Sequence, residues 1–324
     1  MSDFLPITLW KSMARIRLIE EALAEAYPKE EMRCPMHLSI GQELVGAAAG
    51  CSMQVGDMSV SSHRAHAHYL GKGGSLRGLV SELHGKKTGC SGGVGGSMHL
   101  CAPEVGFMGS TAIVGNSIPV GVGLALAIQT KKLNQIVCVH IGEGAVEEGV
   151  FYESVNFAAV RELPVLFLCE NNKYSVYSSL SVRQPQGRRI WKMVEAMGVK
   201  SVHLSSVDAE GFTKRLTSFV EEIRQTKRPL FIETDAYRWR EHCGPNFDDE
   251  LNYRPPEEVE RAREVDPLNV LTQKLINQQQ LSDSLILEWE AKVEAEIESC
   301  MEQARRAPWP DYNHLEELTY AGGK

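Results

Sequence analysis

Apolar and polar residues are arranged along this chain in blocks typical of amphipathic helices and buried strands. From about Leu9 to Ala26 the apolar residues recur with helical spacing, which predicts an amphipathic helix near the N-terminus. Short apolar runs follow at 136–141 and 163–169, and another ends just before Thr234. Runs of this length, bounded by turn residues, are typical of strands that are buried on both faces.

The alternation of these blocks predicts the fold class. Strands and helices alternate as far as about Thr234, which is typical of α/β proteins with crossover helices between parallel strands. We therefore expect a doubly wound, mainly parallel sheet flanked by helices over residues 1–265. Residues 266–324 are expected to form a C-terminal helical appendage and tail.

The appendage contains two signals for helices. Asp266 followed by Pro267 predicts a helix start, with Asp as the cap and Pro in the first turn. A last helix is expected from about Asp283 to Arg305. Its apolar residues recur every four positions and form one stripe, which consists of Leu285, Trp289, Val293, Ile297 and Met301.

Composition excludes several classes of protein. A chain of 324 residues can bury a large core, and its net charge of -8 argues against general binding of nucleic acid. No apolar span is long enough for a transmembrane helix, and the N-terminus lacks the basic start and apolar core of a signal peptide. The eight cysteines are scattered, as expected for reduced thiols in the cytoplasm.

Polar residues follow two successive apolar runs and suggest chemistry. The run 136–141 is followed by Gly-Glu-Gly-Ala, and the next run is followed by Glu-Asn-Asn-Lys-Tyr. Neighbouring parallel strands end at the same sheet edge, so the acid Glu143 and the amide Asn172 should lie close together. With the Tyr174 carbonyl they form a set of hard oxygen ligands, which Mg2+ binds while leaving positions for phosphate oxygens. The alternative interpretation is two ordinary surface turns.

The two turns resemble the thiamine-diphosphate motif, which starts with Gly-Asp-Gly and ends with Asn-Asn at about this separation. Glu143 replaces the usual Asp and adds one methylene to the metal shell. The segment 147–159 resembles the alpha subunit of the decarboxylating component of 2-oxoacid dehydrogenases, of the pyruvate, acetoin and branched-chain types. The resemblance extends from about Leu9 to Pro267. It implies a thiamine-diphosphate-binding fold, thiamine diphosphate and Mg2+ as cofactors, and Glu143, Asn172 and Tyr174 as metal ligands.

The resemblance also implies roles for residues near the N-terminus. His37 matches a family histidine that faces the substrate side of the cofactor, where an imidazole can protonate an oxyanion. A core histidine is the alternative. His63 and Arg64 match an aromatic-or-His and Arg pair that contacts the cofactor and its diphosphate. Three histidines between positions 63 and 68 also suggest zinc, but no Cys or acid stands at typical ligand spacing and Arg64 would repel a cation.

The segment 112–115 matches a family segment whose Ile-Val pair, here Ile113 and Val114, contacts the aminopyrimidine. Ala112 and Val114 are therefore expected to bind the cofactor. Ala112 stands where the family usually has Gly, and it would be strained if the backbone there needed a positive φ. The small-residue segment 121–127 that follows is expected to be a buried helix.

The remaining cofactor residues flank the diphosphate. Gly144 and Ala145, in the turn after the predicted metal ligand, are expected to contact it. Arg238 and His242 match a family arginine and a loop histidine that reach the diphosphate and the mouth of the active site. We assign a catalytic role to His37 and His242. A solvated surface loop is the alternative for the segment that contains Arg238 and His242.

The activity implied by the resemblance needs other proteins. A beta subunit would supply the pyrimidine-binding half and the activating glutamate in an α2β2 assembly. The enzyme would decarboxylate a 2-oxoacid, or cleave acetoin, and transfer the acyl group to the lipoyl arm of an acyltransferase. Two alternatives remain open, a non-oxidative carboligase that forms acyloins with the same cofactor and a cofactor-free structural subunit.

Overall fold

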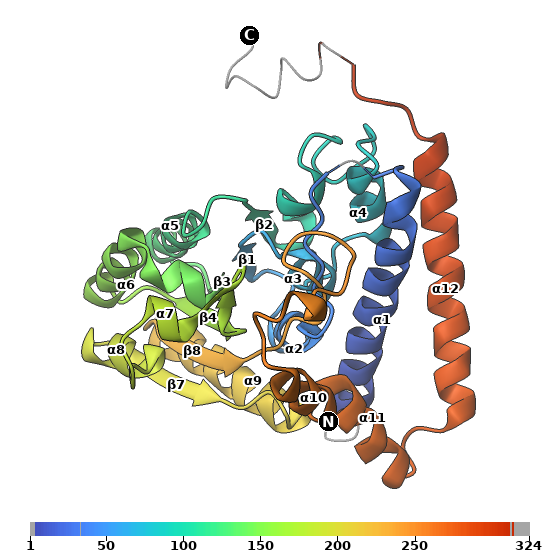
Figure 1. Ribbon diagram of the computed structural model, residues 1–324. Coiled ribbons are helices and arrows are strands. Elements are labelled where there is room, and N and C mark those ends of the chain that lie inside the picture. Colours follow the sequence, from blue (N-terminus) through green and yellow to red (C-terminus); the bar gives the residue numbers. More distant parts are fainter. Residues whose placement is uncertain (1–3, 33, 312, 314–324) are drawn as a thin grey trace.

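A six-stranded sheet forms the centre of the molecule (Figure 1). The computed structural model describes residues 4–32, 34–311 and 313. All strand pairs in the sheet are parallel, in the order β2-β1-β3-β4-β8-β7, which confirms the predicted fold class. The strands are β1 (Met58–Ser61), β2 (Phe107–Ser110), β3 (Val137–Gly142), β4 (Val165–Asn171), β7 (Lys200–Leu204) and β8 (Leu230–Asp235).

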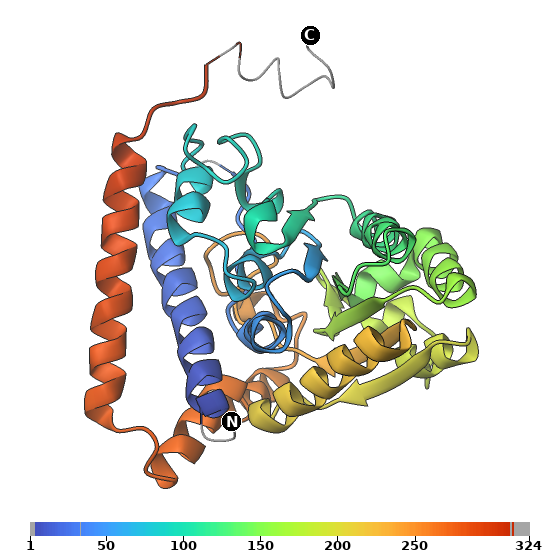
Figure 2. The same cartoon turned by 180° about the vertical axis from the view of Figure 1, so that it is seen from behind.

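Helices join these strands and cover both faces of the sheet (Figures 1 and 2). On one face lie α5 (Ser117–Thr130), α6 (Gly149–Arg161) and α8 (Ile190–Ala196). On the other lie α1 (Phe4–Ala26), α2 (Glu43–Ser52), α3 (His66–Gly71), α4 (Leu76–Leu83) and α9 (Ala209–Thr226). Between β4 and α8 the chain forms the hairpin β5 (Tyr174–Ser175) and β6 (Ser178–Ser179), then α7 (Leu180–Arg183).

The covered sheet explains why the strand sequences are apolar without alternation. Side chains of successive strand residues point to opposite faces. Val137 and Val139 are buried against α5 and α6, whereas Cys138 between them belongs to the core on the other face. Both faces are therefore largely dry, which favours apolar side chains along the central strands.

The C-terminal helices pack on the same core as the sheet. α10 (Pro256–Glu264) is followed by α11 (Pro267–Asn277) and α12 (Asp283–Arg306), which lies alongside α1 (Figure 2). The Trp10 indole donates a hydrogen bond to Thr272 Oγ1 at 2.9 Å, and Arg15 pairs with Glu296 at 2.6 Å. The boundary at residue 265 remains a prediction, and most of the expected tail, 314–324, lies outside the described residues.

The predicted start of α11 is confirmed, and the predicted stripe on α12 is confirmed in part. The Asp266 side chain caps α11 by accepting a hydrogen bond from the Leu268 backbone N–H, with Pro in the first turn. On α12 the stripe is buried at Val293, Ile297 and Met301, but Leu285 is 50% exposed. In the first turn of α12 it is the neighbouring Ile286, outside the predicted stripe, that packs against the core. No helix in the described ranges is long and apolar enough to cross a membrane.

Candidate active site

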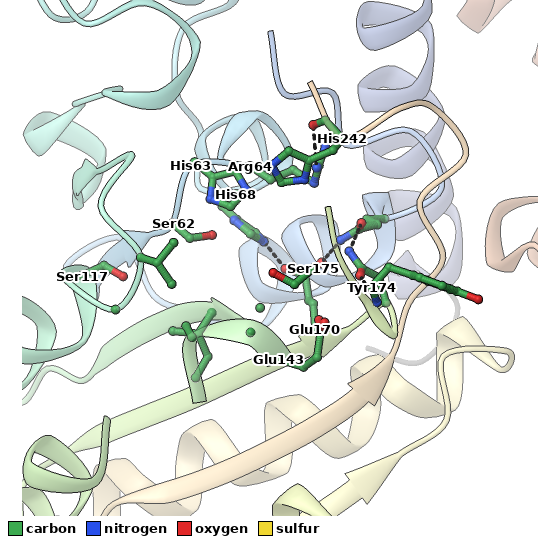
Figure 3. A pocket seen from close by; sticks show the side chains of 18 residues that line it. Ser62, His63, Arg64, His68, Ser117, Glu143, Glu170, Tyr174, Ser175 and His242 are labelled. Carbon is green, nitrogen blue, oxygen red and sulfur yellow. Dashed lines mark hydrogen bonds and ion pairs between the residues drawn. The ribbon is translucent and has the colours of Figure 1, made fainter. Parts of the chain in front are cut away.

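Polar residues gather in one pocket at the carboxyl ends of the parallel strands (Figure 3). Gly142 and Glu170 are register partners on β3 and β4, so the residues after each strand lie side by side. The segment after β1 contributes His63 and Arg64, and the loop after β8 contributes His242. Ligands of open α/β sheets bind at this edge.

The three predicted metal ligands line one side of this pocket. Glu143, Asn172 and Tyr174 all border it. The Asn172 amide nitrogen donates to Gln42 Oε1 at 3.2 Å, and its Oδ1 accepts from the Tyr174 backbone N–H at 3.1 Å. The hydrogen bond to Gln42 fixes which way the amide is turned. An amide oxygen has two lone pairs, so Oδ1 keeps one for a ligand.

Glu143 already has a positively charged partner. Arg183, the last residue of α7, donates to Glu143 Oε1 at 2.6 Å and also pairs with Glu147 at 2.5 Å. Burial raises the pKa of the Glu143 carboxyl, and the Arg183 guanidinium opposes that rise. The sequence interpretation missed Arg183, which follows the hairpin in a segment without a motif.

Arg64 supplies a buried positive charge on the other side of the pocket. It is 7% exposed and donates hydrogen bonds to the Leu38 carbonyl and, at 3.0 Å, to the His242 carbonyl. Within the described residues no carboxylate forms an ion pair with it. Burial and the nearby Arg238 charge lower the pKa of Arg64 to about 9, so it stays charged at neutral pH. A buried cation without a counter-ion is suited to bind an anion.

Three histidines pack around the inner end of the pocket. The His37 ring centroid lies 4.9 Å from that of His63 and 5.2 Å from that of His242. Burial, reinforced by the Arg64 charge, lowers the pKa values of His37, His63 and His242 to about 2, 3 and 4, respectively. All three imidazoles are therefore neutral at pH 7, so each has one donor and one acceptor nitrogen. His37 Nδ1 is buried and has no hydrogen-bond partner among the described residues.

The three histidines between positions 63 and 68 do not share a ligand site. His66 Nδ1 contacts Glu20 Oε1 at 2.6 Å, and its Nε2 contacts Ser97 Oγ at 2.8 Å. His68 pairs with Glu170 instead, whereas His63 packs on His37. The zinc alternative is therefore wrong for this set. The start of α3 at His66 turns the three side chains in different directions.

A buried hydrogen-bonded network that the sequence interpretation missed leads to Asn172. Ser61 Oγ contacts His68 Nδ1 at 2.7 Å, and His68 Nε2 contacts Glu170 Oε1 at 2.5 Å. Gln42 donates to Glu170 Oε2 at 3.2 Å and accepts from Asn172. The signal in the sequence was Glu170, a carboxylate in an otherwise apolar strand, because buried acids are almost always paired.

The comparison with known proteins agrees with this geometry. Residues 11–313 match the family model described as "Dehydrogenase E1 component". The chain belongs to this family. It is 34% identical over 314 residues to the pyruvate dehydrogenase E1 component subunit alpha of Rickettsia felis, covering 97% of this chain and 95% of that protein. The Rhizobium meliloti subunit is 30% identical over 307 residues (94% and 87%), and the mitochondrial alpha-2 subunit of Arabidopsis thaliana is 30% identical over 312 residues (95% and 77%).

Membership of the dehydrogenase E1 component family confirms the resemblance seen in the sequence. The chain is an alpha-type subunit of a thiamine-diphosphate-dependent 2-oxoacid dehydrogenase, an oxidoreductase. The pocket fits this cofactor chemically, because Arg64 lacks a counter-ion among the described residues and hard oxygen donors lie near it. The backbone at Gly144 also lies close to the β5–β6 hairpin, since a Cβ on Gly144 would be 3.3 Å from Ser175 Oγ.

Four further predicted cofactor residues of this E1 component differ in their positions. Gly144, Ala145 and Val114 line the pocket, and Val114 is 48% exposed at its mouth. Ala112 does not line it. Its backbone N–H donates to His99 Nε2 at 3.3 Å, and its φ is not positive, so the expected strain is absent.

Arg238 lies behind the pocket and does not line it. It is 2% exposed and donates to the Val176 carbonyl at 3.1 Å and to the Tyr253 hydroxyl at 2.9 Å. Asp248 pairs with it at 3.5 Å. The expected contact of Arg238 with the diphosphate stays a prediction. Its side chain instead ties the β5–β6 hairpin to the loop after β8.

Proposed function

We propose that this E1 component works as the alpha subunit of an α2β2 2-oxoacid dehydrogenase that requires Mg2+ and acts in the cytoplasm. A lipoyl acyltransferase would accept its acyl product. The observation that carries the proposal is the buried Arg64, without an ion-pair partner among the described residues, facing the oxygen donors Glu143 and Asn172 across one pocket. The eight free cysteines are consistent with a reducing compartment.

The cofactor would be held from two sides. Glu143, the Asn172 side chain and the Tyr174 carbonyl would bind Mg2+, because hard oxygen ligands suit this ion. Arg64 would bind the diphosphate through charge-assisted hydrogen bonds. When bound, thiamine diphosphate supplies a nucleophilic carbon and an electron sink for decarboxylation. The protein supplies the orientation and the charges around it.

The histidines would act on the substrate side. His63 and His242 line the pocket and are neutral, so each can donate a hydrogen bond from one ring nitrogen and accept a hydrogen bond or a proton at the other. His37 packs behind them and holds an Nδ1 without a partner among the described residues. We assign the three rings to hydrogen bonding with the carbonyl oxygen of a 2-oxoacid and to proton transfer there.

The pocket also supports the need for a beta subunit. Ile113 is 64% exposed and Val114 is 48% exposed, in the segment expected to contact the aminopyrimidine. An apolar segment exposed beside a binding pocket is suited to being covered by another protein. A beta subunit on this side would complete the site and supply the activating glutamate.

Cofactor binding tests the proposal. The chain is co-expressed with a beta-type partner, and binding of thiamine diphosphate is measured by calorimetry with and without Mg2+. We expect Mg2+-dependent binding that is lost in Asn172→Ala and kept in Asn277→Ala, a control at the exposed last residue of α11. Absence of binding in the unaltered complex would contradict the proposal and favour the cofactor-free structural subunit.

An acceptor screen of the same complex separates the two enzymatic alternatives. Acyl transfer from a 2-oxoacid to lipoamide is expected for the dehydrogenase. Acyloin formation without acyl transfer would instead identify the enzyme as a carboligase. The same screen, run on the chain without partner, should show no turnover, because the pyrimidine-binding half is missing.

A further inference from the structure

Arg183 occupies a position at the predicted metal site that the proposed function does not use. We propose that Arg183 is a built-in counter-cation of Glu143 that weakens binding of a divalent metal ion until a diphosphate arrives. The inference rests on the proposed function, because it concerns the same metal site. It assigns to Arg183 the coupling of metal binding to cofactor binding.

The contacts of Arg183 show that it is held firmly. Its Nη2 donates to Glu143 Oε1 at 2.6 Å, its Nη1 to Glu147 Oε1 at 2.5 Å and its Nε to the Ser178 carbonyl at 3.1 Å. The Arg183 side chain is 11% exposed and that of Glu143 is 3% exposed. A planar guanidinium bridging two carboxylates is a well-oriented, charge-assisted arrangement.

A metal ion bound by Glu143 would lie close to this guanidinium. Mg2+ binds its oxygen ligands at about 2.1 Å. A divalent ion and a guanidinium on the same small carboxylate repel each other, and the repulsion is strong where water is largely excluded. Metal binding in the absence of cofactor therefore requires Arg183 to leave Glu143 or to share it, and either change lowers the metal affinity.

A bound diphosphate would offset this repulsion between the metal ion and Arg183. Its negative charges would lie next to the turn that contains Gly144, and a Cβ built on Gly144 is 3.8 Å from Arg183 Nη1. The anion would thus offset the charge of both cations at once. Arg183 could also stay near, because Glu147 and the Ser178 carbonyl hold it independently of Glu143.

The position of Arg183 in the chain supports this coupling. The residues between β4 and α7 include Tyr174, whose carbonyl is a predicted metal ligand, and Ser175, which borders the same pocket. Val176 between β5 and β6 has a φ of 54°, a left-handed conformation that is unusual for a β-branched residue. One short segment thus carries a metal ligand and the competing cation.

Binding of Mn2+ tests the inference. Mn2+ replaces Mg2+ at oxygen sites, and its free ion is followed by electron paramagnetic resonance. The full-length chain, purified with its beta partner, is titrated with Mn2+ in the absence and presence of thiamine diphosphate. Arg183→Gln removes the counter-cation. Arg228→Gln is the matched control, because Arg228 pairs with Glu162 in an exposed ion pair just before β8, at the opposite sheet edge.

Without cofactor, we expect Arg183→Gln to bind Mn2+ at least about tenfold more tightly than the unaltered protein. Arg228→Gln should change nothing, and the gain should disappear when Glu143→Gln is combined with Arg183→Gln. Thiamine diphosphate should raise Mn2+ affinity more in the unaltered protein than in Arg183→Gln. Arg183→Lys, which keeps the charge but cannot bridge both carboxylates, should show a smaller gain if Arg183→Gln does not fold.

The outcomes separate this inference from the proposed function. Equal Mn2+ affinity of the folded Arg183 variants and the unaltered protein would overturn the inference, as would a gain that persists with Glu143→Gln. In both cases the proposed function stands if Mn2+ and thiamine diphosphate still bind together to the unaltered complex. Failure of that joint binding would instead contradict the proposed function.

Discussion

Three neutral histidines in one buried cluster make the stability of this protein sensitive to acid. The pKa values of His37, His63 and His242 are lowered to about 2, 3 and 4 in the folded chain, below the value of about 6.5 for an unfolded chain. The unfolded state therefore binds more protons over this window. The stabilisation is complete above about pH 6.5 and is lost as the pH falls, down to about 4 for His242, about 3 for His63 and about 2 for His37.

Urea unfolding at several pH values checks this expectation. Each histidine should contribute up to about 1.4 kcal/mol of lost unfolding free energy per pH unit within its window. His63→Gln should reduce the slope by roughly one such contribution. Gln303→Asn, which changes an exposed side chain without a titrating group on α12, should leave the slope unaltered. A slope that does not respond to His63→Gln would show that the cluster does not titrate with unfolding.

Gln42 positions the predicted metal ligand Asn172 and is not itself a predicted ligand. It donates to Glu170 and accepts from the Asn172 amide, so it fixes the direction of the Asn172 oxygen. Partners that orient a metal ligand typically contribute about 10–100-fold to metal affinity. We expect Gln42→Leu to weaken Mg2+-dependent binding of thiamine diphosphate by about tenfold or more.

Calorimetry on the complex with the beta partner measures this effect. Gln303→Leu, an exposed position on α12, is the matched control and should bind normally. The thermal unfolding of Gln42→Leu must resemble that of the control for the comparison to hold. Normal cofactor affinity in a folded Gln42→Leu variant would mean that Asn172 is oriented by other contacts.

The structural elements show what the sequence could and could not predict. Strands β3, β4 and β8 were predictable because both faces of the sheet are covered there, which favours apolar runs such as 136–141. The start of α11 was predictable because Asp266 and Pro267 act locally. The pairing of Arg183 with Glu143 spans 40 positions, and that of Gln42 with Asn172 spans 130. Such pairs are set by the arrangement of crossovers and loops, which no local pattern encodes.

The hairpin after β4 illustrates the same limit. Its turn places Val176 at a positive φ, a conformation for which β-branched residues have no local preference. Arg238, from the loop after β8, holds this turn by donating to the Val176 carbonyl. The family resemblance indicated that Arg238 matters, but only the structure shows that its contact is with the hairpin.

A buried ion pair ties the start of β1 to α9 at the sheet edge opposite the pocket. Arg224 on α9 bonds both oxygens of Asp57, at 2.9 and 2.6 Å, and Asp57 also accepts from the Ile136 backbone N–H at 3.0 Å. Asp57 is 1% exposed. Removing its charge would leave the Arg224 guanidinium buried without a full counter-charge, so Asp57→Asn should lower the free energy of unfolding by about 3–5 kcal/mol.

Urea unfolding of Asp57→Asn is best compared with Glu222→Gln. Glu222 lies on the same helix as Arg224 and pairs with Lys200 in an exposed ion pair, which should contribute less than about 1 kcal/mol. A loss for Asp57→Asn no larger than that for Glu222→Gln would show that the hydrogen bonds of an uncharged amide at this position suffice to hold this edge.

At the scale of the whole molecule, the two sides of the sheet differ in what covers them. The side of α1 and α2 is overlaid by α11 and α12 (Figures 1 and 2). On the other side, the outer faces of α5 and α6 keep apolar side chains in solvent, with Val120 50%, Phe157 42% and Val160 72% exposed. Exposed apolar residues on these two neighbouring helices favour a contact with another protein on this side.

This difference predicts where the partner binds. Phe157 and Val160 are three positions apart on α6, so they share one face of the helix. Replacing either by Asp places a charge in a surface that should become dry on assembly, and such central positions are worth about 2 kcal/mol or more, roughly 30-fold in affinity. We expect Phe157→Asp and Val160→Asp to leave the isolated chain folded but to weaken its assembly with the beta partner.

Leu287→Asp on α12, exposed at 66% but at the far side of the molecule, should assemble normally in sedimentation experiments. Equal assembly of all three variants would show that the partner surface does not extend to α6 and is confined to the pocket mouth around Ile113.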